Sequence, residues 1–590
     1  MGVRRLQTYL EQYCPDACYE VSIEQIANNY RQTHNKEPVI VVDGSCCYRK
    51  LYGGLDWVCG GQYKEHVDSI TKFIDSFERL GIKLVLYFDG ATQESKRPVW
   101  VSRRLQSMEK AHAIFDALKA GQEVKRMDKE LYVLPAGAGS VMSSISRTRC
   151  MVQRSLKECD EEITEYAARN KCFAILAQDS DFVIYKNGAD YYLSSENLNI
   201  DTMTTLVYDK EALARHLNLD VRDLPVFASL MGNDFIPADD LKPFHNWLMG
   251  KRRHKNYVQA LVLRVADFVY KLPKGNDLFS CLRELSYDIF RTPHRAKDLR
   301  QSILSYVKSS KDILRIIDNR CEKWDKILSV AHDNYISMAS PSYVYNILRK
   351  LPFEMSTALE DCRITVQPSA AALRLMRQRI YGVALREYPG GPDGLVVEEW
   401  CMSGPQSLKC ALKVNAILPP DDSPLLLDLW FNDSEELIIK KFKLLAWIGS
   451  FHLTSTNLHT LPHPLLPAVI ILSYLYHDAG ILLDWEVKVF AAVIIDVQIM
   501  ESKELSAVTV NKVDVRGVQL ATLFTRSITH LGLANSICGN PIEVHWTRHP
   551  QLFDGKLFQI SYLNGKSVPP SPKRGNIQQF NQLCDVVLKH

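Results

Sequence analysis

The stretch V-I-V-V-D-G-S (39–45) decides the fold, because a short β-branched run ends in an acid followed by glycine. Pro38 opens this run, and residues 39–43 predict a buried strand. Similar endings occur in L-V-L-Y-F-D-G (84–90) and A-I-L-A-Q-D-S-D-F (174–182). An acid that closes an apolar run is poor core material, since a buried ion must be paired or bound to a metal.

Helical segments separate these runs. Residues 66–80 place apolar side chains at helical spacing, and a second strand is expected at 82–89. A short third strand is expected at 132–134, and a helix near 158–170 leads into a fourth strand at 172–178. Strands that alternate with helices predict a parallel α/β sheet, in which ligands bind beyond the carboxyl ends of the strands.

The acids at these strand ends are candidates for one shared site. Like charges gathered at one sheet edge repel unless divalent cations hold them together. Two Mg²⁺ or Mn²⁺ ions there would suit phosphodiester hydrolysis, because one activates the attacking water and the other stabilises the leaving oxygen. The predicted metal ligands and catalytic acids are Asp43, Asp89, Glu158, Asp160, Asp179, Asp181 and Asp234.

Each acid taken alone also has a local explanation. Glu158 and Asp160 stand where a helix begins and could cap it or complement its dipole. Asp43 and Asp89 each precede a glycine and could be turn residues, and Asp234 could cap the following turn. Only the set of acids together favours a shared metal site over these readings.

Two basic residues follow Asp89 and are candidates to clamp a scissile phosphate, Lys96 and Arg103. Pro98 predicts the first helical turn, which leaves Lys96 just outside the helix. The alternative is a solvated basic helix end.

Three other features keep more than one explanation each. Trp57 and Trp100 could stack on bases or pack the domain. Cys46–Cys47 could be redox-active or buried packing cysteines. The basic run Lys251–Lys255 could contact phosphates, serve as a nuclear import signal, or begin a solvated helix.

Composition is that of an ordinary intracellular protein. The 590 residues are 46% hydrophobic and 24% charged with a net charge of +3, so any phosphate-binding surface must be local. The fifteen cysteines contain no C-x-x-C pair, which favours reduced thiols in cytosol or nucleus. The start, M-G-V-R-R-L, lacks the apolar core of a signal peptide. The apolar run 465–476 is too short to span a bilayer and predicts a buried helix, so no membrane partner is expected.

Four regions are expected along the chain. Y-P-G-G-P-D-G (388–394) predicts a hairpin or long turn between strands at 381–385 and 395–400. The expected regions are an α/β domain at 1–250, a helical extension at 251–360, a hairpin-containing linker at 361–420 and a helical C-terminal domain at 421–590.

Several motifs resemble the XPG/flap-endonuclease superfamily in their order and spacing. They are M-G-V, D-G-S, F-D-G, E-x-D, D-S-D and G-N-D-F, and they span residues 1 to 240. The resemblance implies a PIN-like, flap-nuclease sheet domain in which all seven acids are metal-site acids. It further implies that Lys96 and Arg103 steer phosphates and that Gly2 is tucked beside the active site.

A narrower resemblance covers most of the chain. W-V-C-G-G-Q-Y (57–63), K-R-P-V-W-V-S-R-R-L (96–105) and segments between 515 and 558 are similar to the family of constitutive coactivators of PPAR-gamma. Asteroid-type nucleases look like more distant relatives. The resemblance implies a regulatory protein of the nucleus, and also of the cytoplasm, that acts with nuclear receptors or binds DNA or RNA.

Two departures bear on function. The segment after Asp234 lacks the Gly-x-Gly pair with which flap endonucleases grip duplex phosphates, and no L-x-x-L-L receptor-docking motif occurs. We therefore expect a transcription coactivator or nucleic-acid adaptor with a divalent-metal site. The alternative is an active Mg-dependent, structure-specific endonuclease that cleaves single-stranded, overhang or flap nucleic acid.

Overall fold

The structure of the chain is a computed structural model. It describes residues 2–123, 131–185, 188–250, 255–307, 322–402 and 408–589. Apart from Lys255, the basic run 251–255 lies outside the described residues. Within the described ranges, every helix is too short or too polar to traverse a bilayer.

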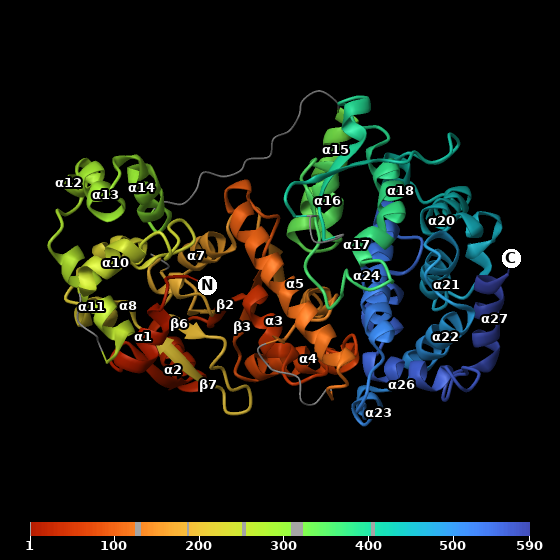
Figure 1. Cartoon of the computed structure of the whole chain (residues 1–590), viewed down its shortest axis with the longest axis horizontal. Coiled ribbons are helices and arrows are strands. Elements are labelled where there is room, and N and C mark those ends of the chain that lie inside the picture. The colour runs from red at the N-terminus through yellow and green to blue at the C-terminus, as the bar shows by residue number, and fades with distance from the viewer. Residues whose placement is uncertain are drawn as a thin grey trace. The chain divides into compact units, whose positions relative to one another are not determined.

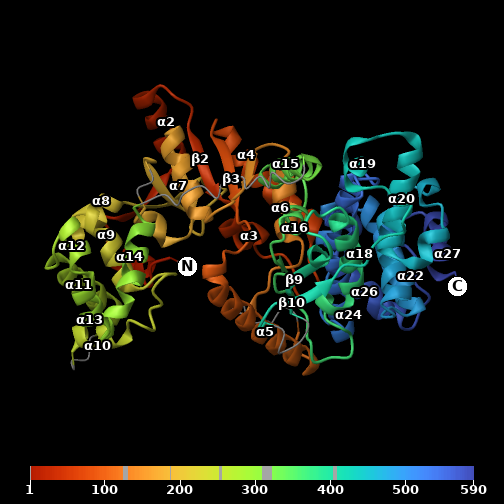
Figure 2. The ribbon, with the colours of Figure 1, turned by 90° about the horizontal axis from the view of Figure 1, so that it is seen from above.

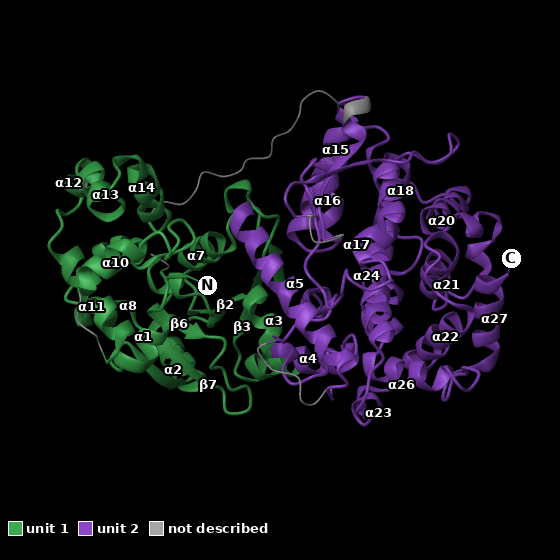
Figure 3. Cartoon of the chain, in the orientation of Figure 1, with its two compact units in different colours: residues 1–50, 72–96, 149–314 green, residues 51–71, 97–148, 315–590 purple. Residues whose placement is uncertain are grey.

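The chain divides into two compact units, which Figure 3 shows in different colours. Each unit is assembled from separate stretches of the sequence. Unit 1 comprises residues 1–50, 72–96 and 149–314, and unit 2 comprises residues 51–71, 97–148 and 315–590.

Unit 1 is built on a seven-stranded sheet with the order β1-β7-β6-β5-β2-β3-β4. The run from β6 to β4 is parallel, and β7 is antiparallel to both β6 and β1. The central strands β2 and β5 are buried almost throughout, as expected when helices cover both faces. The bounds are β1 (Cys18–Ser22), β2 (Val39–Asp43), β3 (Lys83–Phe88), β4 (Met151–Arg154), β5 (Ala174–Ala177), β6 (Tyr191–Ser194) and β7 (Thr204–Tyr208).

The strands expected at 39–43, 82–89 and 172–178 are confirmed as β2, β3 and β5. The strand expected at 132–134 is wrong, since these residues are irregular and Tyr132 packs against aromatic rings of unit 2. The edge strand is β4 instead, which pairs with β3 although its mixed sequence M-V-Q-R carries little strand signal.

Helices surround this sheet (Figures 1 and 2). Helix α7 packs against β2, β3 and β5. The helices from α9 to α14, which follow β7 in the sequence, pack against one another. The helices expected at 66–80 and 158–170 are confirmed as α4 and α7. The bounds are α1 (Leu6–Tyr13), α2 (Ile23–His34), α3 (Gly44–Tyr52), α4 (Tyr63–Arg79), α7 (Cys159–Asn170), α8 (Lys210–His216), α9 (Leu224–Met231), α10 (Lys242–Met249), α11 (Tyr257–Tyr270), α12 (Asn276–Ser280), α13 (Leu282–Phe290) and α14 (Ala296–Ser305), with α3 and α4 passing from one unit into the other.

Unit 2 is mainly helical and includes a three-stranded sheet of order β10-β9-β8. The buried helix expected at 465–476 is confirmed, since every residue of α21 is buried. The fold class, an α/β sheet domain followed by a mainly helical C-terminal region, is likewise confirmed. The bounds are α5 (Arg97–Lys119), α6 (Ala138–Ser146), α15 (Glu322–Ile336), α16 (Ser342–Leu348), β8 (Phe353–Glu354), α17 (Ser369–Ala372), α18 (Arg374–Leu385), β9 (Val396–Trp400), β10 (Leu412–Asn415), α19 (Leu426–Phe431), α20 (Glu435–Gly449), α21 (Leu466–Ser473), α22 (Asp484–Ile499), α23 (Ser502–Ser506), α24 (Val515–Ile537), α25 (His549–Leu552), α26 (Gly555–Gly565) and α27 (Ile577–Leu588).

The strand expected at 395–400 is confirmed as β9, whereas the strand expected at 381–385, and with it the hairpin around 388–394, is wrong. Residues 381–385 form the last turns of α18, where Met376 and Ile380 continue the same buried helical face. Strand β9 pairs with β10 and β8 instead. The apolar run 381–385 is too short for the spacing of its apolar residues to distinguish a helix from a strand.

Candidate metal centre

The acids of unit 1 lie where the parallel strands end. Asp43 is the last residue of β2, and Asp89 directly follows β3. Asp179 follows β5 and caps the 3₁₀ turn Ser180–Val183, in which Asp181 lies. Because β5, β2 and β3 are parallel neighbours, their carboxyl ends meet at one edge of the sheet.

Three of these acids converge closely. Oxygens of Asp160, Asp179 and Asp181 all lie within 4.8 Å of one another. Asp160 comes from the first turn of α7, and the Asp181 amide donates to Asp179 Oδ1 at 3.1 Å. Carboxylate oxygens gathered in this way are the ligands that Mg²⁺ and Ca²⁺ prefer in proteins.

Crowding shifts the pKa of the buried acids upward. Burial, then repulsion from Asp89 and Asp179, raises the pKa of Asp43 to about 7. Burial and Asp179 likewise raise the pKa of Asp181 to about 7, and the same causes raise that of Asp160 well above its usual value. Within the described residues, no Lys or Arg forms an ion pair with Asp43, Asp160 or Asp181. A divalent cation would supply the missing positive charge.

Lys96 lies beside two of the other acids, Glu158 and Asp234. Its Nζ lies 2.5 Å from Glu158 Oε2 and 3.5 Å from Asp234 Oδ2. Burial alone would lower the pKa of Lys96, but Glu158 and Asp234 outweigh it and raise that pKa. Glu158 occupies the N-cap position of α7, yet its side chain makes no capping hydrogen bond there. Its side chain pairs with Lys96 instead of capping the helix.

The helix that follows Lys96 belongs to the other unit. Helix α5 begins at Arg97, as Pro98 indicates, and it carries Arg103 in unit 2, whereas the acids and Lys96 belong to unit 1.

The weaker candidates have structural roles. Trp57 packs edge-on against Tyr132 at 5.6 Å between ring centroids, beside a buried apolar cluster. Trp100 contacts the guanidinium groups of Arg97 and Arg104 at 5.4 and 5.0 Å from its ring centroid. A hydrogen bond to Cys47, together with burial, raises the pKa of Cys46 well above its usual value, so Cys46 is not an activated thiolate.

A buried polar network that the sequence did not reveal supports the cluster. The Tyr306 hydroxyl donates to Asp181 Oδ1 at 2.6 Å. Asn233 Nδ2 donates to the Tyr306 hydroxyl at 3.0 Å, while its Oδ1 accepts the amides of Phe235 and Ile236. Asn233 thereby fixes the turn that carries Asp234. The sequence signal for this network was limited to Asn233, which stands next to the candidate ligand Asp234. Tyr306 gave no signal, because it lies 125 residues from Asp181 in the sequence.

Gly2 lies against the same cluster. Its φ is +51°, and a Cβ at this position would stand 1.9 Å from Asp179 Oδ1 and 2.8 Å from the Ser180 amide. The Arg4 amide donates to the Gly232 carbonyl at 2.8 Å, which holds the segment in place. Only glycine fits here without displacing Asp179.

Fold and site together define the class: an α/β domain with clustered acids at the carboxyl edge of its parallel strands. A family described as "FAM120A-like domain" matches residues 217–310. The chain is 28% identical to the constitutive coactivator of peroxisome proliferator-activated receptor gamma of Bos taurus, over 100% of this chain and 95% of that protein. The Mus musculus protein of that name is 25% identical over 100% of this chain and 92% of its own length. Over its full length the chain is therefore similar to these coactivators.

The chain is also similar, over part of its length, to solved structures. One is the catalytic core of Rad2, at 16% identity, with 53% of this chain and 79% of that chain covered and a TM-score of 0.27. Another is human GEN1 in complex with Holliday junction DNA, at 13% identity, with coverages of 65% and 80% and a TM-score of 0.33.

Proposed function

We propose that the acidic cluster of unit 1 binds a divalent cation, Mg²⁺ or Mn²⁺, in a regulatory protein that contacts single-stranded or junction nucleic acid. The observation that carries this proposal is the convergence of Asp160, Asp179 and Asp181 beside the buried Asp43, with no basic partner on Asp43, Asp160 or Asp181 among the described residues. Four ionised carboxyls in one pocket would repel one another strongly, and a divalent ion removes that repulsion.

The position of Lys96 favours binding over hydrolysis. A two-metal reaction needs two ions about 4 Å apart, each with its own acids. The Lys96 ammonium already lies between Glu158 and Asp234, where it supplies a positive charge to the acids that would hold the second ion. The geometry therefore supports one ion at Asp160, Asp179 and Asp181, where the sequence led us to expect two.

The metal half of the proposal is tested by calorimetry. Chelator-treated protein is titrated with Mg²⁺ and Mn²⁺, and one bound ion per chain is expected. The variant Asp179→Ala/Asp181→Ala should lose this binding, whereas Asp220→Ala, which removes an exposed acid paired with Arg222, should keep it. Equal binding by all three proteins would refute the assignment.

The nucleic-acid half is tested by fluorescence anisotropy. Labelled single-stranded, flap and duplex DNA and RNA are compared with and without Mg²⁺, at two salt concentrations, because phosphate contacts weaken as salt rises. Binding of single-stranded or flap substrates is expected to depend on the ion. The names of the relatives support a coactivator role, and our proposal extends that role to this chain and adds a nuclear location. Reporter assays with nuclear receptors and imaging of the tagged chain test that part.

A metal-dependent endonuclease is the second candidate function. It is favoured by the close spacing of Asp160, Asp179 and Asp181, and by Lys96 beside Glu158, which could contact a phosphate. In that case one ion would lower the pKa of the attacking water, while Lys96 would stabilise the charge on the phosphate. Mg²⁺-dependent cleavage of flap, overhang or single-stranded substrates, abolished in Asp179→Ala/Asp181→Ala, would establish the enzyme and displace the purely regulatory reading.

A further inference from the structure

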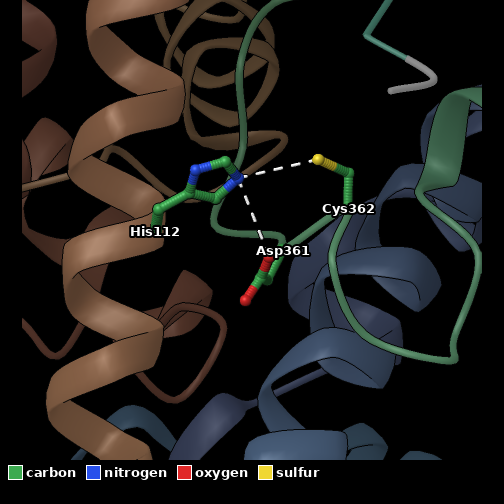
Figure 4. A group of neighbouring side chains, drawn as sticks. All are labelled: His112, Asp361 and Cys362. Atoms are coloured by element: carbon green, nitrogen blue, oxygen red, sulfur yellow. Dashed lines mark hydrogen bonds and ion pairs between the residues drawn. The ribbon is translucent and has the colours of Figure 1, made fainter. Parts of the chain in front are cut away.

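A second group of metal-ligating side chains lies in unit 2, away from the acidic residues described above. His112 comes from the middle of α5, and Asp361 and Cys362 come from the loop between β8 and α17. Figure 4 shows the three side chains pointing toward one another. The His112 Nε2 atom lies 3.6 Å from Cys362 Sγ and 3.7 Å from Asp361 Oδ1. All three ligand atoms lie within 4.8 Å of one another.

These separations are those of ligands around one small ion. A tetrahedral zinc ion bound at about 2.0–2.3 Å from each ligand atom places those atoms about 3.4–3.6 Å apart. The observed distances from His112 Nε2 to its two neighbours come within a few tenths of an ångström of that range. One nitrogen, one carboxylate oxygen and one thiol sulfur form a donor set that suits Zn²⁺ rather than Mg²⁺.

The surrounding residues hold Asp361 rigidly. Its side chain is fully buried, and it accepts hydrogen bonds from the Arg363 amide at 2.9 Å, from Arg363 Nε at 2.8 Å and from Lys119 Nζ at 3.1 Å. Its own amide donates to Gln519 Oε1 at 2.9 Å. Metal ligands are usually oriented by outer contacts of this kind.

The ion pairs around Asp361 form a neutral group. Arg363 also pairs with Asp116, at 2.7 Å from Nη2 to Oδ1. Asp361 and Asp116 therefore balance Lys119 and Arg363, and the group is neutral before any ion arrives. Binding of Zn²⁺ with loss of the Cys362 proton would leave the group with a single positive charge. Because the His112 side chain is 19% exposed, solvent can reach the group and hydrate that charge.

A catalytic Cys-His-Asp relay does not fit this geometry. Such a relay needs the nucleophile on one ring nitrogen and the acid on the other. Here Cys362 Sγ and Asp361 Oδ1 both face Nε2 of His112. Two different side chains on one nitrogen are the arrangement expected when a cation lies among all three.

We propose that His112, Asp361 and Cys362 form a Zn²⁺ site whose fourth ligand is water. With three protein ligands the coordination is open, so the ion can take a solvent molecule or an incoming group. The site lies entirely within unit 2 and is independent of the metal proposed for unit 1.

Cobalt substitution tests this proposal on the full chain. Co²⁺ in a tetrahedral site with a thiolate ligand gives a sulfur-to-cobalt charge-transfer band, which carboxylate sites lack. Chelator-treated wild type is expected to develop this band with one equivalent of Co²⁺ and to lose it when Zn²⁺ is added. Cys362→Ser should abolish the band, and His112→Ala should weaken Co²⁺ binding by more than about a hundredfold.

Two control variants separate this site from others. Cys410→Ser removes an exposed thiol elsewhere and should keep the band. Asp179→Ala/Asp181→Ala should keep the band while losing Mg²⁺ binding, so that failure of one metal site is distinguishable from failure of the other. Circular dichroism checks that each variant is folded. If Cys362→Ser does not fold, Co²⁺ binding by His112→Ala tests the proposal instead. Absence of the band in folded wild type, or its survival in Cys362→Ser, overturns the assignment.

Discussion

The Tyr306 hydroxyl donates a hydrogen bond of 2.6 Å to Asp181 Oδ1 in the buried interior of unit 1. Tyr306 follows α14, within the segment that matches the FAM120A-like family, whereas Asp181 lies beside the sheet. This bond joins the helical group of unit 1 to the acidic cluster. It orients one carboxylate oxygen of Asp181 and leaves the other available for an ion.

Replacing Tyr306 by phenylalanine is expected to disturb the cluster without opening a cavity. Loss of a hydrogen bond to a buried carboxylate should lower the free energy of unfolding by about 2 kcal/mol. The freed Asp181 carboxylate should also weaken divalent-cation binding about tenfold to a hundredfold, as loss of an orienting contact does at metal sites. Urea denaturation and calorimetry measure the two effects.

The matched control for that change is Tyr208→Phe. The Tyr208 hydroxyl donates to Glu11 Oε1 at 2.7 Å, so this variant also loses a tyrosine–carboxylate bond, outside the acidic cluster. Its metal affinity should equal that of the wild type. A similar loss of affinity in both variants would show that Tyr306 acts on stability alone.

Gly2→Ala is expected to damage the acidic cluster through the backbone. The added Cβ would overlap Asp179 Oδ1 and would also force a side chain into φ +51°. We expect divalent-cation affinity to fall at least about tenfold, as measured by calorimetry. Gly54→Ala, where a Cβ meets nothing within 4 Å, should bind the ion as the wild type does. Unchanged affinity in Gly2→Ala would mean that the contact with Asp179 is not maintained in solution.

Much of unit 1 follows from its sequence because strand ends are locally encoded. An apolar run closed by Asp-Gly predicted both the end of β2 and the place of Asp43, and the same holds for β3 and Asp89. Edge strand β4 escaped prediction because its side chains do not alternate and its pairing with β3 is set by tertiary contact.

Long-range pairings lay beyond sequence reasoning. Cys362 and His112 are 250 residues apart, without the short ligand spacing that marks a sequence-encoded zinc site. Lys96 was expected to face a phosphate, yet its partners are Glu158 and Asp234, which only the fold brings within its reach. The sequence shows that Lys96 carries a positive charge, but its partners depend on how α7 and the turn after α9 pack in the fold.

Removing the Lys96 ammonium should open a second cation position. In Lys96→Met the acids Glu158 and Asp234 lose their partner, so a second divalent ion can take its place. Calorimetry is expected to show two bound ions per chain instead of one. The control Lys72→Met removes an exposed pair with Asp201, worth little in solution, and should still bind one ion. If Lys96→Met also binds one ion, the lysine does not exclude the second.

Stability of the metal-free protein should fall as pH rises from about 4 to about 7. In the unfolded chain an aspartate ionises near pH 3.9, whereas folding raises the pKa of Asp43 and Asp181 to about 7. Between these values the folded state retains protons that the unfolded state has released. The contribution of these two residues is therefore fully present below pH 4 and is lost as pH rises through 7, at up to about 1.4 kcal/mol per pH unit for each retained proton.

Urea denaturation of wild type and Asp181→Asn across this range isolates the effect, because asparagine stays neutral at every pH. The variant should gain stability relative to wild type as pH rises, since it avoids burying the charge. Mg²⁺ at neutral pH should restore wild-type stability, by about 2.7 kcal/mol at a hundredfold excess over Kd, and leave the variant less affected. A wild-type-minus-variant difference that stays flat from pH 4 to 7 would show that the acids are not crowded in the folded protein. The reasoning that assigns them a cation would then lose its electrostatic basis.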